Sequence, residues 1–128
     1  YFDDQVWIRD YQWYISDFKN WPDFFTKADL ITTVFYRPLF GFSMMLNALA
    51  GGSNPFIFHL SNLVFHSINC CLVLAILRSL GYNREAAFWF SCLFAVHPVL
   101  VSAVVWIPGR TDSLLAIFVF SSFLFFLS

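Results

Sequence analysis

Charged residues are scarce in this chain of 128 residues. They make up 12% of it, whereas hydrophobic residues make up 59%, and the mean hydropathy is +0.68. A soluble domain of this length carries about 25% charged residues. The composition therefore excludes an ordinary soluble domain and predicts an all-α membrane protein, and the length accommodates one domain at most.

Excess positive charge and a cysteine framework are also lacking. The net charge of −1 gives no electrostatic reason to expect a nucleic-acid partner. The three cysteines do not form a secreted disulfide framework, because Cys70 and Cys71 are adjacent and Cys92 lies in another apolar segment. We expect three buried free thiols. The chain has no initiating methionine and stops inside an apolar run, so we expect a window from a longer protein.

Residues 1–54 are rich in aromatic and charged side chains and do not resemble a membrane span. Aromatic and aliphatic residues recur at spacings of three and four and predict a short amphipathic helix: Trp7, Tyr11, Tyr14, Ile15 and Phe18. A helix is expected from Trp21-Pro22-Asp23 to about Thr32, and another from Pro38 to about Ala50. The latter covers only about 20 Å, so we expect these helices to lie in the membrane interface.

The stretch from Pro55 to Leu77 is the first full-length candidate for a transmembrane helix. It has no acidic or basic residue except histidine and would be about 34 Å long. Its first half carries a polar stripe within about 80° of the helix surface. The stripe consists of His59, Asn62, His66 and Asn69. In lipid such a stripe faces protein or water, which leaves hydrogen bonding between helices and substrate binding both open.

A metal site within this stripe is not predicted. His59 and His66 are about 10.5 Å apart along the helix axis, whereas each ligand of one zinc ion lies about 2.0 to 2.1 Å from it. No cofactor is certain from the sequence. A divalent metal held by Asp3, Asp4 and a histidine remains open.

The basic connection from Arg78 to Glu85 is expected on the cytoplasmic side. Residues 86–96 then return outward to Pro98, which ends or kinks the helix. We expect residues 97–112 to form a second external loop with a short helix from Ser102 to Trp106, and residues 113–128 to begin another span. The prediction is thus about three transmembrane helices in residues 55–128, preceded by a first external loop in residues 1–54 that carries membrane-parallel helices.

With this topology the polar groups converge at the outer face of the membrane. They are Asp3 and Asp4, the stripe, and the side chains of His97, Arg110 and Asp112. A simpler structural interpretation stays open for these polar side chains. An aspartate can cap a helix, and an arginine can anchor at lipid headgroups.

Four short motifs carry a resemblance to a known family. They are Phe2-Asp3-Asp4, Tyr36-Arg37-Pro38-Leu39, the stripe from His59 to Asn69, and Phe94-Ala-Val-His97-Pro98 followed by Gly109-Arg110-Thr-Asp112. In this order they resemble the N-terminal membrane region of the C-type glycosyltransferases. The similarity is to the branch of transmembrane O-mannosyltransferases that carry tetratricopeptide repeats, and to their prokaryotic relatives.

The resemblance implies transfer of a mannose-type hexose from a polyprenyl-phosphate donor to a hydroxyl of a protein or glycan. Asp3 or Asp4 matches the catalytic carboxylate, and Asp112 matches a second acidic position. The family pattern suggests an acidic residue four or five positions after His97-Pro98, where this chain has Val101, Ser102 and Ala103. Specificity is therefore expected to differ.

The residue types suit this chemistry. A carboxylate can act as general base on the acceptor hydroxyl. Arg37 and Arg110 can bind the donor phosphate, with His59, Asn62, His66 and His97 as further donor-binding candidates. Membrane lipid is the expected surrounding, in a prokaryotic inner membrane or, if the chain is eukaryotic, in the endoplasmic reticulum. A transporter or channel segment and a non-catalytic membrane scaffold are the alternatives.

Overall fold

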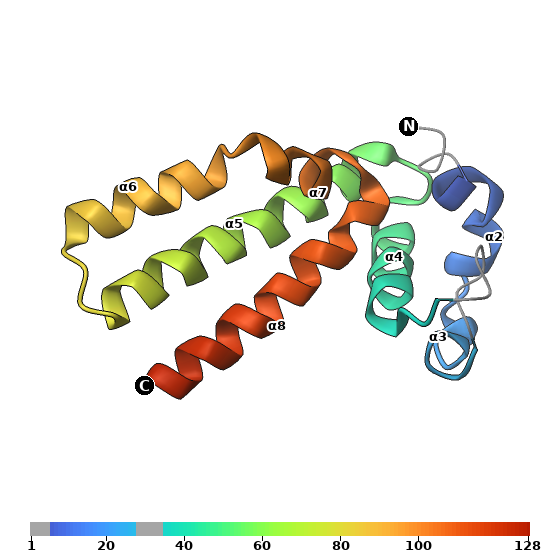
Figure 1. Ribbon diagram of the computed structural model, residues 1–128. Coiled ribbons are helices and arrows are strands. Elements are labelled where there is room, and N and C mark those ends of the chain that lie inside the picture. Colours follow the sequence, from blue (N-terminus) through green and yellow to red (C-terminus); the bar gives the residue numbers. More distant parts are fainter. Residues whose placement is uncertain (1–5, 28–34) are drawn as a thin grey trace. The chain divides into compact units, whose positions relative to one another are not determined.

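The computed structural model describes residues 6–27 and 35–128 (Figure 1). All the regular secondary structure in these two ranges is helical, as predicted. Contacts divide the chain into two compact units, Tyr1–Ser61 and Asn62–Ser128, with the boundary inside one long helix. The two units are described separately below.

The first unit contains short turns followed by one longer helix. In chain order they are the π-turn η1 (Val6–Asp10), α2 (Gln12–Ile15), the 3-10 turn η2 (Phe18–Asn20), α3 (Asp23–Thr26) and α4 (Pro38–Gly51). The predicted amphipathic helix through Phe18 is therefore broken. The carboxylate of Asp17 accepts a hydrogen bond from the Lys19 amide, which offers the backbone an alternative to the helix at this point.

The second predicted helix is also shorter than expected. It ends at Thr26, not near Thr32, because Lys27 has an extended backbone. The Thr26 hydroxyl donates to the carbonyl of Pro22 at 3.0 Å and closes the single turn.

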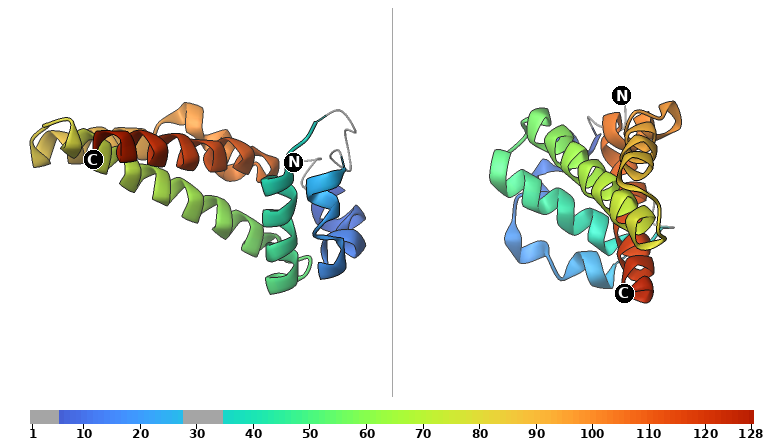
Figure 2. Two further views of the ribbon diagram at one scale, coloured as in Figure 1. Left: turned by 90° about the horizontal axis from the view of Figure 1, so that it is seen from below. Right: turned by 90° about the vertical axis from the view of Figure 1, so that its left-hand side faces the viewer.

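Helix α4 confirms the third predicted helix and forms the core of the first unit. Its buried side chains are Phe40, Met44, Met45 and Ala48. Helices α2 and α3 contact it on one side (Figure 2). Ile15 of α2 is fully buried. The helix ends at Gly52, whose φ of 60° is readily adopted by glycine and costly for other residues.

The second unit is built from three long helices and the segment between the last two. These elements are α5 (Pro55–Ser79, which begins in the first unit), α6 (Arg84–Ala95), the 3-10 turn η3 (Pro98–Leu100), α7 (Val101–Val105), the 3-10 turn η4 (Ile107–Gly109) and α8 (Arg110–Leu127). Helix α6 runs back along α5, and α8 runs in the same direction as α5 (Figure 1).

Two helices in the described ranges are long and apolar enough to cross a membrane, Pro55–Ser79 and Ile107–Leu127. A third span results if α6 and residues 98–105, which meet at a bend of 49°, are counted as one. Large apolar side chains are exposed along these helices, up to 83% for Phe125. The chain is thus an all-α membrane protein with two to three spanning helices, in agreement with the predicted fold class.

The observed helix boundaries around the predicted second external loop differ from the predicted ones in one respect. Pro98 interrupts the helix and a short helix follows at residues 101–105, as expected. However, α8 begins at Arg110 and not at Ser113, so Arg110 and Asp112 lie in its first turn. The 3-10 turn at Pro108 leads directly into the helix, and the Thr111 hydroxyl donates back to the Pro108 carbonyl at 3.2 Å.

The cysteines are free, but the prediction that they are buried is wrong. Cys71 is exposed, and Cys70 and Cys92 are partly exposed. The exposed Cys71 lies on an outward face of α5, which in a membrane protein contacts lipid or another helix.

Candidate functional site

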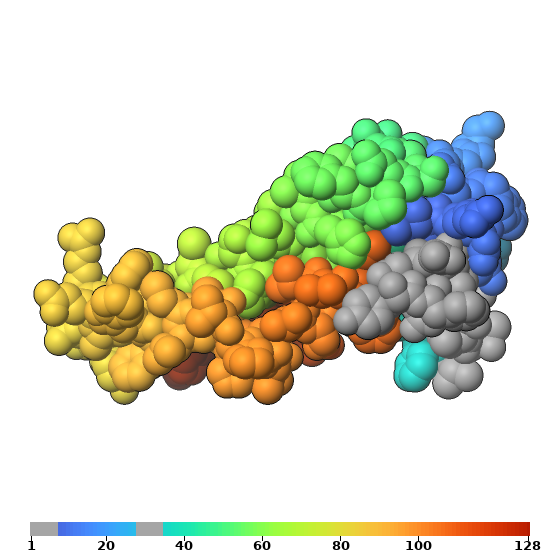
Figure 3. Space-filling view, turned by 90° about the horizontal axis from the view of Figure 1, so that it is seen from above, coloured from blue at the N-terminus to red at the C-terminus, as the bar shows by residue number. Residues whose placement is uncertain are grey.

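Three members of the polar stripe lie in the second unit, where they contact the end of α6, the segment after it and the start of α8. Asn62, His66 and Asn69 are all buried, with 0%, 8% and 2% of their surface exposed. The segments of α6 and α7 lie against this part of α5 (Figure 3). His59, the fourth member of the stripe, belongs to the first unit and is partly exposed.

These three side chains bind backbone carbonyl groups of the neighbouring helices. His66 Nε2 lies 3.1 Å from the carbonyl oxygen of Ala95, at the last residue of α6. Asn69 Nδ2 donates to the carbonyl of Ser113 at 2.9 Å. A carbonyl only accepts, so His66 Nε2 carries the hydrogen.

Asn62 binds carbonyl groups of the segment that follows the helix interruption at Pro98. Its Nδ2 donates to the carbonyls of Val104 and Trp106, at 3.2 and 3.1 Å. Carbonyls at a helix end have no partner within the helix, and lipid supplies none. Asn62, His66 and Asn69 thus act as hydrogen-bond donors between helices, which is one of the two roles that the sequence left open for the stripe.

Arg110 joins this network from the first turn of α8. Its side chain is fully buried, and its Nε donates to Asn62 Oδ1 at 3.0 Å. A cation at this place in a membrane-spanning helix is costly, and such residues usually serve function. Guanidinium groups bind phosphate and carboxylate well because their donors form a planar fork. The sequence predicted both residues as site candidates, and the structure brings them into direct contact.

His97 and Asp112 do not join this network. His97 is exposed, and its Nδ1 accepts a hydrogen bond from the Val99 amide at 3.3 Å, as a cap of the turn η3. Asp112 is exposed in the first turn of α8, where a carboxylate is favourable near the positive end of the helix. Within the described ranges neither side chain forms a hydrogen bond with Asn62 or Arg110.

The remaining predicted residues belong to the first unit. Arg37 precedes α4, and its guanidinium carbon lies 5.2 Å from the ring centres of both Phe35 and Phe40. This arrangement is a cation–π contact with two rings. Asp3 and Asp4 lie outside the described residues, so their expected convergence with Arg110 stays a prediction.

Metal binding stays untested for the same reason. In residues 6–27 and 35–128 no group of three histidine, cysteine or acidic side chains is close enough to hold an ion. The predicted arrangement with Asp3 and Asp4 falls outside these ranges.

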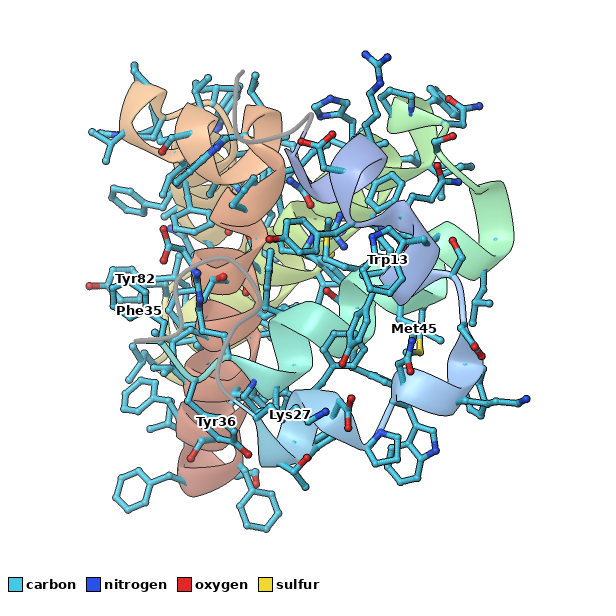
Figure 4. All side chains as sticks on the ribbon, turned by 90° about the vertical axis from the view of Figure 1, so that its right-hand side faces the viewer. Trp13, Lys27, Phe35, Tyr36, Met45 and Tyr82 are labelled. Carbon is cyan, nitrogen blue, oxygen red and sulfur yellow. The ribbon has the colours of Figure 1, made fainter. Side chains whose placement is uncertain are left out.

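A polar cluster in the first unit was missed at the sequence level. The Tyr14 hydroxyl and the Lys27 ammonium both donate to Asp23 Oδ2, each at 2.7 Å (Figure 4 labels Lys27). The hydrogen bonds from Lys27 and Tyr14 lower the pKa of Asp23. Burial, with the Asp23 carboxylate beside it, raises the pKa of Tyr14 to about 12. The spacing of Asp23 and Lys27 indicates their pairing, whereas nothing in the sequence links Tyr14 to them.

The comparisons with known proteins point to one kind of relative. The chain is 40% identical over 109 residues to protein O-mannosyl-transferase TMTC1 of Mus musculus. The aligned region covers 80% of this chain and 11% of the relative. It is 35% identical over 89 residues to TMTC3 of Homo sapiens, covering 70% and 10% of the two proteins. The identity to Tmtc1 of Drosophila melanogaster is 40% over 77 residues, covering 60% and 9%.

No family model and no solved structure matches this chain. The chain spans only about a tenth of the length of the curated relatives it matches, 11% in the case of mouse TMTC1. Over most of its own length it is similar to proteins named protein O-mannosyl-transferase.

Proposed function

We propose that this chain is part of a membrane mannosyltransferase that transfers mannose from a polyprenyl-phosphate donor to a hydroxyl of a protein. One observation carries the proposal, namely the fully buried Arg110 in a membrane-spanning helix, bound to Asn62. A buried guanidinium suits an anionic headgroup at the membrane. The similarity to protein O-mannosyl-transferases supports the choice of sugar and acceptor.

The reaction follows from the groups involved. The acceptor oxygen attacks the anomeric carbon of mannose, and the bond from that carbon to the phosphate oxygen breaks. Asp3 or Asp4 takes the hydroxyl proton as general base, and polyprenyl phosphate leaves with the electron pair. A single displacement inverts the configuration at the sugar. Arg110 and Arg37 stabilise the charge that develops on the phosphate.

The other predicted residues have lesser parts in this proposal. His59 and His97 are candidates for hydrogen bonds to the donor, and Asp112 for a second acidic role. His66 and Asn62 act through the network around the helix break, because both are bound to backbone carbonyls. A divalent metal near Asp3 and Asp4 would supply further positive charge at the phosphate.

We propose a eukaryotic membrane, the endoplasmic reticulum, as the location. The relatives named above are animal proteins, which does not support the prokaryotic inner membrane that the sequence analysis favoured. The basic connection from Arg78 to Glu85 would then lie on the cytoplasmic side. The polar network, at the opposite end of the helices, would face the lumen.

The proposal is tested by substituting the acidic pair in the full-length protein. Asp3→Asn and Asp4→Asn, alone and together, are assayed for mannose transfer from a polyprenyl-phosphate donor to a protein acceptor. Loss of a general base is expected to lower kcat by about 10² to 10⁴ in at least one single variant. Asp17→Asn, which removes an exposed carboxylate of the same unit, is the control. Wild-type transfer by all three acidic-pair variants would refute the catalytic role.

A further inference from the structure

We propose that one face of helix α4, formed by Leu39, Leu46 and Leu49, binds the acyl chains of bilayer phospholipids. The sequence analysis expected the helices of residues 1–54 at the membrane interface, but it identified neither the helix nor the face that meets lipid. This leucine face is separate from the proposed sugar transfer and from the network around Asn62, and it does not depend on either.

The leucine face is a single exposed stripe. Leu39, Leu46 and Leu49 are 45%, 48% and 47% exposed. At 100° per residue they lie within about 80° of the helix surface. The buried residues of α4 lie on the opposite side of the helix and are Phe40, Gly41, Met44, Met45 and Ala48. Helix α4 is therefore apolar on both sides, and such a helix is surrounded by protein or by lipid.

The other sides of α4 are covered by protein. On one side α2 and α3 contact the helix, and Gly41 lies directly against the ring of Phe24. On another side Asn47 and Gly51 contact the first turns of α5, which belong to the same unit. The leucine face is directed away from these neighbours and keeps about half of its side-chain surface exposed.

The contact with α5 fixes the depth of α4 in the membrane. Helix α5 has 25 residues, and its length of about 37 Å exceeds the hydrocarbon core by about 7 Å, so that about 4 Å lies outside at each end. Ser61 lies about 9 Å from the start of α5 and is thus inside the hydrocarbon region. Its hydroxyl donates to Asn47 Oδ1 at 2.9 Å, and Gly51 lies against Ile57. These contacts hold the end of α4 at the same depth.

The residues of α4 suit lipid at this depth. The helix contains no charged residue, and its polar side chains have partners within the protein. The Ser43 hydroxyl donates to the Phe40 carbonyl at 2.7 Å, and Asn47 binds Ser61. The helix therefore brings no unsatisfied polar side chain into the hydrocarbon region, and the leucine face is free to contact acyl chains.

Cysteine substitution in the full-length protein tests whether water reaches the leucine face. Leu46→Cys and Leu49→Cys are made in a background whose own cysteines are replaced by alanine, and each protein is placed in phospholipid nanodiscs. Lys19→Cys, at an exposed position of the same unit, is the control. Because apolar surroundings lower the thiolate fraction, a charged maleimide should react with both leucine-face variants at least about tenfold more slowly than with Lys19→Cys.

A second measurement separates lipid from protein as the cause of slow reaction. A bimane fluorophore is attached to each cysteine in detergent, before reconstitution with phospholipids that carry bromine on their acyl chains. Fluorescence should be lost in Leu46→Cys and Leu49→Cys and retained in Lys19→Cys. Thermal-unfolding midpoints in detergent should match that of the cysteine-free protein, because the replaced leucines are not part of the core.

Two results would overturn the inference. Reaction of Leu46→Cys as fast as Lys19→Cys would show that the face meets water, and slow reaction without quenching by bromine would show that another protein segment covers it. If the cysteine-free protein does not fold, a photo-reactive phenylalanine derivative replaces Leu46 in the unchanged protein. Phospholipid adducts at this position would then support the lipid contact, and their absence would refute it.

Discussion

Polar side chains are used differently in the two units. In the first, they bind partners close in sequence and remain partly exposed. Tyr14 and Asp23 are nine positions apart, and Ser61 and Asn47 are 14 apart. In the second, Asn62, His66 and Asn69 of α5 and Arg110 of α8 are buried, and their hydrogen-bond partners lie 29 to 48 positions away. Where lipid replaces water, a polar group needs a partner from another helix, and this requirement specifies how the helices pair.

Removing the buried cation should have the largest effect on stability. Arg110→Met leaves Asn62 Oδ1 without the donor that it now has, and an unsatisfied buried acceptor costs about 1 to 3 kcal/mol. The free energy of unfolding in detergent should fall by that amount. Combining Arg110→Met with Asn62→Leu should cost less than the sum of the two single changes, because both partners are then apolar.

Additivity of these two substitutions would contradict the contact between Asn62 and Arg110. Arg37→Met in the first unit is the control. Its guanidinium group lies against two aromatic rings in a partly exposed setting, and we expect a smaller loss of about 0.5 to 1 kcal/mol.

A methyl group at Gly109 should be the next most harmful change. Because the added Cβ meets backbone atoms of Ser102 and Ala103, neither of which can rotate away, Gly109→Ala is expected to cost about 1 to 3 kcal/mol. In Gly41→Ala of the first unit the nearest atoms to the added Cβ belong to the ring of Phe24, a side chain that can turn aside, so this change should cost less. Thermal-unfolding midpoints of the two variants measure the difference, and a greater loss in Gly41→Ala would reverse the comparison.

Loss of one hydrogen bond between helices should have a moderate effect. His66→Leu removes the bond to the Ala95 carbonyl and the stacking on Phe94, whose ring centre is 5.7 Å away. Hydrogen bonds between membrane helices contribute about 0.6 to 2 kcal/mol, so we expect a loss in that range. The exposed Ser67, whose hydroxyl donates to the Leu63 carbonyl of its own helix, gives the control Ser67→Ala, for which no change in the unfolding midpoint is expected.

The smallest effects should appear in the polar cluster of the first unit, and they depend on pH. Tyr14 has a pKa of about 12 in the folded chain against an ordinary value of 10.0, so its contribution to stability is complete below pH 10 and is lost as the pH rises toward 12. For Asp23 the pKa is lowered, so its contribution is present above its ordinary value of 3.8 and is lost as the pH falls through the folded value.

Carbon-13 NMR of the side-chain carboxyl group in the full-length protein tests this cluster. Lys27→Met should raise the pKa of Asp23 more than Tyr14→Phe does, because the hydrogen bond from Lys27 is the larger cause of the shift. Lys19→Met removes the same charge from an exposed position and is the control. Equal shifts in Lys27→Met and Lys19→Met would show that net charge, and not the contact, sets the pKa of Asp23.

The predictions from sequence were correct for features that depend on residues within a single helix. The span from Pro55, the interruption at Pro98 and the helix from Pro38 all follow from apolar runs and from proline, which act within a few residues. They failed where local polar groups compete with a helix, as at Asp17, and at the start of α8, where the turn at Pro108 leads directly into the helix. The orientation in the membrane and the position of Asp3 and Asp4 stay predictions.

The sequence by itself determined that this is a helical membrane chain with a polar stripe on its first span, because composition and the helical period depend only on residue order. Only the tertiary structure decided what the stripe binds. The pairing of Asn62 with Arg110 and with the carbonyls of Val104 and Trp106 joins residues 42 to 48 positions apart, and it depends on how the chain turns where its helices are interrupted. No local sequence pattern predicts this pairing, because it results from packing between separate helices.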